Sequence, residues 1–160
     1  MRTPPAQPDG MVIREESEGH FLAVDRDAPE FSIDGTLTDG ELTFEVVASR
    51  GRRRGQFAGR VFFDAMMRHF GNRVQVIAAV WSDARPEFTT NLNIFNAETK
   101  RNVLKEDSAF ATKTGTWARD YGFTSIRRIR TTPDDFPGGY EQVLVEFVKP
   151  PKRKRSRKGT

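Results

Sequence analysis

The sequence predicts an α+β fold in a single domain, with a mixed, mostly antiparallel central sheet and two main helices packed on it. Short runs rich in β-branched and aromatic residues alternate with turn signals in the first half, which is typical of an antiparallel meander. Residues 42–81 then read as a strand, an Arg/Gly loop, a helix and a second strand. A further helix and two closing strands complete the predicted domain, residues 11–148.

The first half predicts a meander of three strands, over residues 20–24, 31–37 and 41–48. The first run ends in charged residues, and the second alternates apolar and polar side chains. Between the second and third runs, Asp39 and Gly40 form a dipeptide that favours a hairpin turn. Residues 1–10 are rich in proline and are expected to be disordered.

The middle of the chain predicts a helix over residues 56–70, followed by a strand over 74–81. Apolar residues recur at helical spacing along the helix, and Gly71 and Asn72 end it. A stripe this wide is typical of a helix that lies on a sheet. The strand has few polar interruptions, which favours a central position with both faces buried. The helical stripe consists of Ala58, Val61, Phe62, Ala65, Met66 and Phe70, widened by Phe63 and Met67.

The second half predicts a short helix, a long helix and a hairpin of two strands. The run 89–91 is suited to cap a short helix that carries Leu92 and Phe95. Asp107 and Ser108 then open a second long helix, which stops at Gly122. Strands over 124–131 and 140–148 close the fold, joined by a turn-rich segment.

The positive charge of the chain is concentrated at its C-terminus. Residues 149–160 carry seven basic residues and no acidic one, which leaves 19 basic and 22 acidic residues before position 149, a net charge of −3. A run of this kind cannot bury itself and is expected to be disordered. It has two interpretations, a solubilising terminus or an electrostatic contact with nucleic acid or another anionic surface.

Composition argues against several classes of protein. No apolar run approaches the length of a membrane span, and the N-terminus does not resemble a secretory signal, so a cytoplasmic location without membrane contact is expected. With no cysteine, the chain has neither disulfides nor thiolate ligands. No metal site is expected, because the two histidines, His20 and His69, lie far apart in the sequence.

The Arg/Gly loop before the first long helix has the composition of an anion site. A glycine-rich turn that enters a helix exposes unpaired N–H groups at the positive end of the helix dipole, and arginines strengthen its attraction for phosphate. The other interpretation is a basic surface loop whose glycines serve only the backbone geometry. The loop is neither a Walker motif nor a dinucleotide fingerprint. The candidate phosphate ligands are Arg52, Arg53, Arg54, Gly55, Gln56, Phe57, Ala58, Gly59 and Arg60.

This order of elements resembles the GNAT acyltransferase superfamily over about residues 31–148. The resemblance depends on the loop, helix and strand of 50–81 and on the phrase 118–123, Ala-Arg-Asp-Tyr-Gly-Phe, which is similar to the usual end of the family's fourth helix. It implies a GNAT-like acyltransferase that uses acetyl-CoA or a related acyl-CoA and an amine acceptor. The loop amides of 52–60 would hold the coenzyme A pyrophosphate, although Phe57 stands where the family has a small residue.

The resemblance also implies roles for residues of the preceding strand. Val46, Val47 and Ala48 would pair with the pantetheine arm beside the strand 76–81, and Glu45 would be the general base that deprotonates an ammonium substrate. The other interpretation of Glu45 is an exposed strand carboxylate. The sequence departs from the family where a tyrosine commonly protonates the leaving thiolate, since that position is Ala118.

A second resemblance, to C-terminal modules of bacterial polymorphic toxins and effectors, implies a different function. It depends on the phrases at 66–71, 91–96 and 112–115, to which no chemistry is assigned. The corresponding hypothesis is a module that binds or acts on nucleic acid through the tail 149–160. The arginines at 127, 128 and 130 would face the nucleic acid in that interpretation, and form a solvated face otherwise.

Overall fold

The computed structural model describes residues 10–26, 28–46, 58–84, 89–135 and 139–151. The segments expected to be disordered, 1–10 and 149–160, lie mostly outside these residues, as does the Arg/Gly loop before position 58. Within them the chain forms one seven-stranded sheet and four α-helices, connected in places by short 3-10 turns. The α+β class and the mixed, mostly antiparallel sheet are therefore confirmed.

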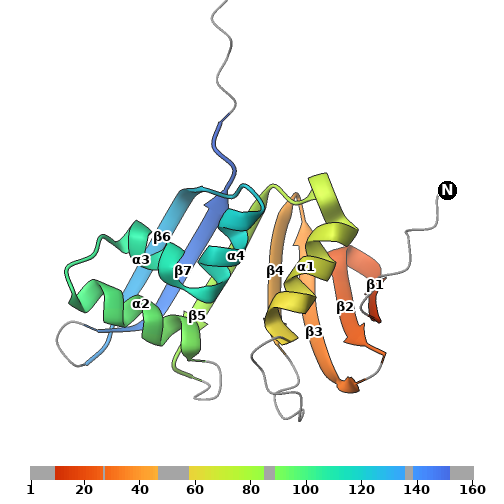
Figure 1. The fold of residues 1–160 in the computed structure, drawn as a ribbon, viewed down its shortest axis with the longest axis horizontal. Helices are drawn as coiled ribbons and strands as arrows, with labels where there is room; N and C mark the ends of the chain where they lie inside the picture. Colours follow the sequence, from red (N-terminus) through yellow and green to blue (C-terminus); the bar gives the residue numbers. More distant parts are fainter. Residues whose placement is uncertain (1–9, 27, 47–57, 85–88, 136–138, 152–160) are drawn as a thin grey trace, which may run out of the picture.

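The sheet has the strand order β1-β2-β3-β4-β5-β7-β6 (Figure 1). Strands β1 to β4 form an antiparallel meander, and β6 and β7 form a hairpin whose second strand lies antiparallel to β5. Only β4 and β5 run parallel. The strands are β1 (Met11–Glu15), β2 (His20–Asp25), β3 (Ala28–Thr38), β4 (Glu41–Val46), β5 (Val76–Ser82), β6 (Ser125–Pro133) and β7 (Tyr140–Val148).

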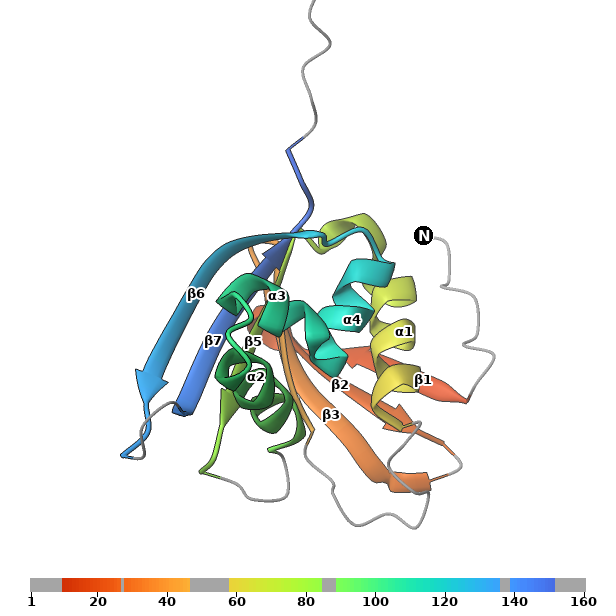
Figure 2. The same cartoon turned by 60° about the vertical axis from the view of Figure 1, so that its left-hand side comes forward.

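All four helices pack on the same face of the sheet, which we call the helical face. Helix α1 (Ala58–Phe70) lies over the meander, whereas α2 (Thr90–Lys100), α3 (Lys105–Ala111) and α4 (Lys113–Asp120) lie over β5, β7 and β6 (Figures 1 and 2). Inward side chains of the strands meet aromatic rings of the helices, and these contacts form one core. The ring pairs are Phe21 with Phe70, Phe44 with Phe63, Trp81 with Phe95, and Phe147 with Phe110.

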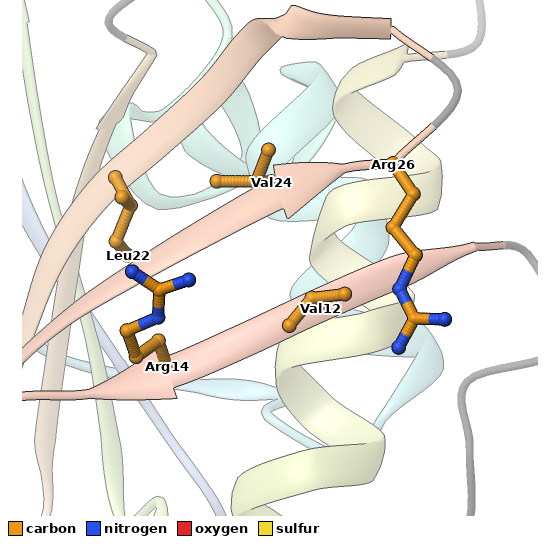
Figure 3. Close-up of a pocket in the computed structure, with 5 residues that line it drawn as sticks. All are labelled: Val12, Arg14, Leu22, Val24 and Arg26. Carbon is orange, nitrogen blue, oxygen red and sulfur yellow. The ribbon is translucent and has the colours of Figure 1, made fainter.

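No described helix covers the opposite face of the sheet, which we call the open face. The prediction that the strand 74–81 is buried on both faces was therefore wrong, and Val80 on the open face is 55% exposed. A shallow depression of about 330 Å³ lies on this face over β1 and β2 (Figure 3). Its floor is apolar and two arginines flank it: Val12, Leu22, Val24, Arg14 and Arg26.

The predicted second long helix is broken into two helices at Thr112. This residue has φ −68° and ψ 163°, an extended conformation that ends α3 and precedes α4. Its hydroxyl donates to the Ala109 carbonyl at 2.6 Å and accepts from the Gly115 N–H at 3.0 Å. A threonine side chain that satisfies both helix ends competes with a continuous helix. One long helix was thus the wrong prediction, and α3 also begins two residues earlier than Asp107.

The polar residue Asn91, at the start of α2, caps a different helix from the one predicted. Its side-chain carbonyl accepts from the Lys113 N–H at 2.9 Å, and its amide donates to the Thr114 hydroxyl at 3.0 Å. The cap therefore satisfies the first turn of α4, 22 positions along the chain. Its contribution is to fix α2 against α4.

Edge strand β1 was missed by the sequence analysis, because a five-residue run with two charged residues carries a weak alternation signal. In the structure β1 is held to α1 by Glu15. This carboxylate accepts from Arg73 at 2.7 Å and lies 3.0 Å from His69 Nε2. Hydrogen bonds from Arg73, opposed by partial desolvation and supported by His69, lower the pKa of Glu15 to about 2.

Replacing Glu15 with Gln is expected to remove a pH-dependent part of the stability. A carboxylate with a lowered pKa stabilises the fold above its unfolded pKa of 4.5, and this stabilisation is lost as the pH falls toward about 2. Since the side chain is 43% exposed, solvent screening limits the effect to about 1 kcal/mol or less. Urea unfolding of the native chain and the variant at several pH values measures this difference in the free energy of unfolding. Glu16→Gln, an exposed neighbour on the same segment, is the control, and an equal loss in both variants would contradict the prediction.

Candidate functional site

The parallel junction of β4 with β5 is confined to one end of the two strands. Only Glu41 with Val76 and Leu42 with Ile77 are in register, although β4 continues to Val46 and β5 to Ser82. Each strand keeps its other neighbour along its length, β3 for β4 and β7 for β5. Beyond the two pairs the strands diverge, and Figure 1 shows them parting toward the end at which α1 begins.

The diverging part of β5 turns unpaired backbone groups toward β4. The Val76 N–H donates to Gly40 on the β4 side, whereas the Asp83 N–H donates to Glu141 on the β7 side. Because these directions alternate along a strand, the N–H and C=O groups of Ala78 and Val80 point to the β4 side. No strand of the described part of the chain pairs with them there. Among the described residues, two N–H and two C=O groups inside the sheet therefore have no strand partner, and such groups need one.

Aromatic side chains flank the junction on the helical face. The Phe63 ring lies 6.1 Å from that of Phe44 on β4 and 5.7 Å from the half-buried indole of Trp117 on α4. The indole also crosses the first turn of α1 so closely that a Cβ at Gly59 would lie 2.8 Å from Trp117 Cη2. A side chain at position 59 would displace the indole, so the glycine allows α4 to approach the start of α1 closely.

A network of ion pairs and hydrogen bonds joins α1 to α4 next to this aromatic group. Arg60 donates to Asp120 at 2.7 Å and to Asp64 at 3.0 Å, and the Tyr121 hydroxyl donates to Asp64 at 2.6 Å. Hydrogen bonding to Asp120 raises the pKa of Arg60, and burial, with the bond to Asp64, raises the pKa of Tyr121 to about 12. The charge of Arg60 is therefore balanced by two carboxylates.

The sequence-predicted site residues fall into two groups. Eight of them lie outside the described residues: Val47, Ala48, Arg52, Arg53, Arg54, Gly55, Gln56 and Phe57. Glu45 and Val46 lie on β4, with backbones opposite Asp34 and Ile33 of β3. Ala58, Gly59 and Arg60 form the first turn of α1. The structure thus places the described candidates at the end where β4 and β5 part, although Arg60 is already paired.

The family resemblance would place a thiolate-protonating tyrosine at position 118, where this chain has an alanine. Ala118 is fully buried in the core, and the next tyrosine along α4, Tyr121, donates its hydroxyl to Asp64. Tyr121 therefore points toward α1. The Tyr121 hydroxyl is thus already engaged by Asp64.

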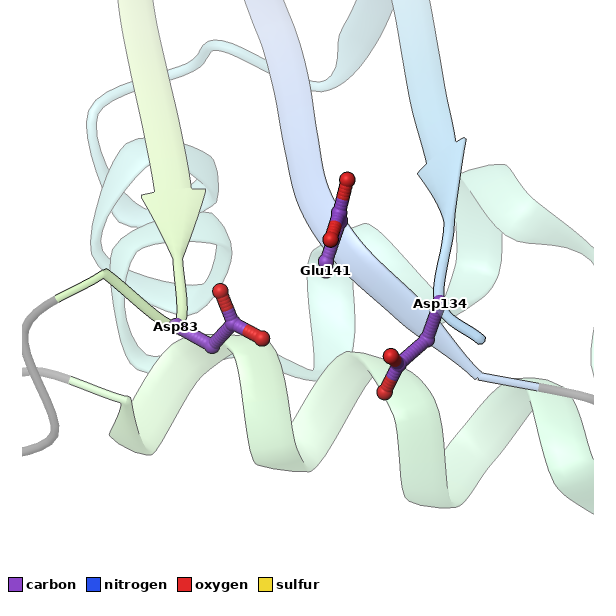
Figure 4. Close-up of side chains that lie close together, drawn as sticks. All are labelled: Asp83, Asp134 and Glu141. Atoms are coloured by element: carbon purple, nitrogen blue, oxygen red, sulfur yellow. The ribbon is translucent and has the colours of Figure 1, made fainter. Parts of the chain in front are cut away.

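Three carboxylates that the sequence analysis did not bring together meet at the far end of β5. Asp83, Asp134 and Glu141 offer oxygen atoms within 4.8 Å of one another (Figure 4). They come from the ends of three different strands, so no spacing in the sequence could reveal them. Oxygen ligands of this kind suit a hard divalent cation. Asp83 and Glu141 are exposed, so water screens much of the repulsion among the three charges.

Comparison of the chain with protein-family models, with curated proteins and with solved structures gave no match. Among the residues that the structure describes, no helix is both long and apolar enough to cross a lipid bilayer.

Proposed function

We propose that the protein is a GNAT-like acyltransferase that transfers an acyl group from acyl-CoA to an amine. The observation that carries the proposal is the two-pair junction of β4 and β5, which opens a row of unpaired backbone groups inside an otherwise continuous sheet. The pantetheine arm of coenzyme A is an extended chain with two amide groups. Such a chain fits between parting strands as an additional strand would, with the N–H and C=O groups of Ala78 and Val80 as partners.

The position of α1 supports the same ligand. Helix α1 begins at the end where the two strands diverge, so the N–H groups of its first turn and the positive end of its dipole lie toward the open end of the junction. A phosphate group that extends past the pantetheine arm would meet this end. Gly59 allows the close approach of α4 there, and Trp117 offers an aromatic surface beside it.

The chemistry is an attack of a neutral amine on the thioester carbonyl. The C–N bond forms, the C–S bond breaks, and the ammonium substrate must first lose a proton to a base. The family resemblance assigns that base to Glu45. Since Ala118 provides no hydroxyl, we infer that the leaving thiolate takes its proton from water. A thiolate whose conjugate thiol has a pKa of about 8.5 is protonated readily at neutral pH.

Titration calorimetry with coenzyme A tests the proposal. We expect saturable heat and a thermal shift at concentrations up to about 1 mM, because a ligand that binds only the native state raises the apparent stability. 3'-Phospho-ADP, which keeps the pyrophosphate and lacks the pantetheine arm, is the matched control ligand and should bind at least about tenfold more weakly. Equal affinity for both ligands, or no heat with coenzyme A, would contradict a pantetheine site at the junction.

A further inference from the structure

Edge strand β6 carries a line of arginines on the open face of the sheet. Arg128 lies opposite Glu146 and Arg130 opposite Leu144, so both side chains project from the face that no described helix covers. The two positions are two residues apart on one strand, which places them about 7 Å from each other along it. Thr132 is next on the same face, so these side chains of β6 offer no apolar group.

The positive charge of this strand exceeds what its neighbours neutralise. Glu146, a buried carboxylate, accepts from Arg127 at 2.6 Å, and Arg128 Nε lies 3.8 Å from its other oxygen. One carboxylate thus serves two guanidinium groups, with Glu41 3.9 Å from Arg127 as a second, longer contact. Arg130 forms no ion pair with any residue that the structure describes.

The arginine strand β6 lies next to the point at which the chain leaves the sheet. Ser125, the first residue of β6, pairs with Val148, the last residue of β7, so the chain leaves the sheet beside the start of the arginine strand (Figure 1). Lys149 follows at once and lies over the Phe123 ring at 5.2 Å. Residues 152–158 then add six basic residues and no acidic one. The described chain therefore leaves the sheet next to β6, and the sequence that follows carries only positive charge.

We propose that Arg128, Arg130 and Lys149, which we call the basic edge, bind the sugar-phosphate backbone of nucleic acid. A guanidinium group binds phosphate through two parallel N–H donors, and a row of them along an extended strand matches a linear polyanion. Contacts of this kind go to phosphate and not to base edges, so the proposed binding is independent of sequence and driven by counterion release. The proposal goes beyond acyl transfer and does not depend on it, because Arg128 and Arg130 project from the open face, on the other side of the sheet from α1.

Salt-dependent binding of a fluorescent single-stranded RNA to the full chain tests this inference. Each phosphate contact contributes about 0.7 to the slope of log K against log salt, so Arg128→Gln with Arg130→Gln should flatten the slope by about 1.4. Arg14→Gln with Arg26→Gln is the matched control: it removes the same charge from the same face at the opposite edge of the sheet (Figure 3), and it should leave the slope unchanged.

Three results would overturn the proposal. The slope could stay the same in the Arg128 and Arg130 double variant, which would mean that the terminal residues bind alone. The control variant could flatten it equally, which would mean that only net charge matters. Vesicles that contain phosphatidylserine could bind while RNA does not. Arg130→Gln alone separates binding from folding, because this side chain has no ion pair among the described residues, and it should flatten the slope by about 0.7 at an unchanged unfolding midpoint.

Discussion

Replacing Gly115 with Ala is expected to lower the free energy of unfolding by about 3 kcal/mol or more. A Cβ at this position would overlap the Ala109 carbonyl oxygen and lie 2.8 Å from the Phe110 Cα. Both are backbone atoms, so no side-chain rotation relieves the overlap, and α3 and α4 must move apart. Their separation would also break the bond of Thr112 to the Gly115 N–H. Overpacking of this severity belongs to the most destabilising substitutions.

Urea unfolding followed by circular dichroism measures the effect. Gly139→Ala is the matched control, because a Cβ there meets its nearest atom, Asp134 Cβ, only at 3.8 Å. The control should change the stability by no more than about 0.5 kcal/mol. If both variants unfold at the urea concentration of the native chain, the close contact at the α3–α4 break is absent in solution.

Replacing Val80 with Pro is expected to weaken coenzyme A binding by about tenfold or more. Proline removes one N–H that faces β4 in the diverging part of the junction and leaves the ladder of β5 with β7 in place. A ligand amide that loses this donor remains unpaired in a partly buried site, and that cost is about 1–3 kcal/mol. The Val80 side chain is 55% exposed on the open face, so the substitution removes little packing.

Val80→Ala is the control, since it keeps the N–H and shortens the same side chain. Calorimetric titration of both variants, with circular dichroism to verify the fold, compares them directly. Similar affinities would show that the N–H of position 80 does not contact the ligand. A loss of affinity in both would mean that the side chain contributes, and the proposed pairing along the backbone would need revision.

Much of the secondary structure followed from local patterns. The helix predicted over 56–70 is α1, and the strands predicted over 20–24, 31–37 and 140–148 are β2, β3 and β7. These segments have strong periodicity and clear turn signals, as at Gly40 and Gly71, both of which adopt positive φ. The break at Thr112 was missed because a threonine in a helical pattern reveals its role only through the partners of its hydroxyl.

The candidate site was predictable only in outline. The resemblance placed the ligand between the strand at 43–48 and the strand at 76–81, and the structure shows that these strands share two register pairs before they diverge. Arg60, in the first turn of α1, was expected to hold phosphate. In the structure Arg60 pairs with Asp120, 60 positions away, and that contact leaves no trace in the sequence around either residue.

Composition and periodicity were sufficient to predict an α+β domain and a basic C-terminus, because both depend on residues that are neighbours in the chain. The tertiary structure decided where β4 and β5 part, which face carries the helices and which arginines are already paired. These properties depend on contacts between distant segments. Hydrogen bonds and ion pairs of that kind form only when folding brings their partners within about 3 Å.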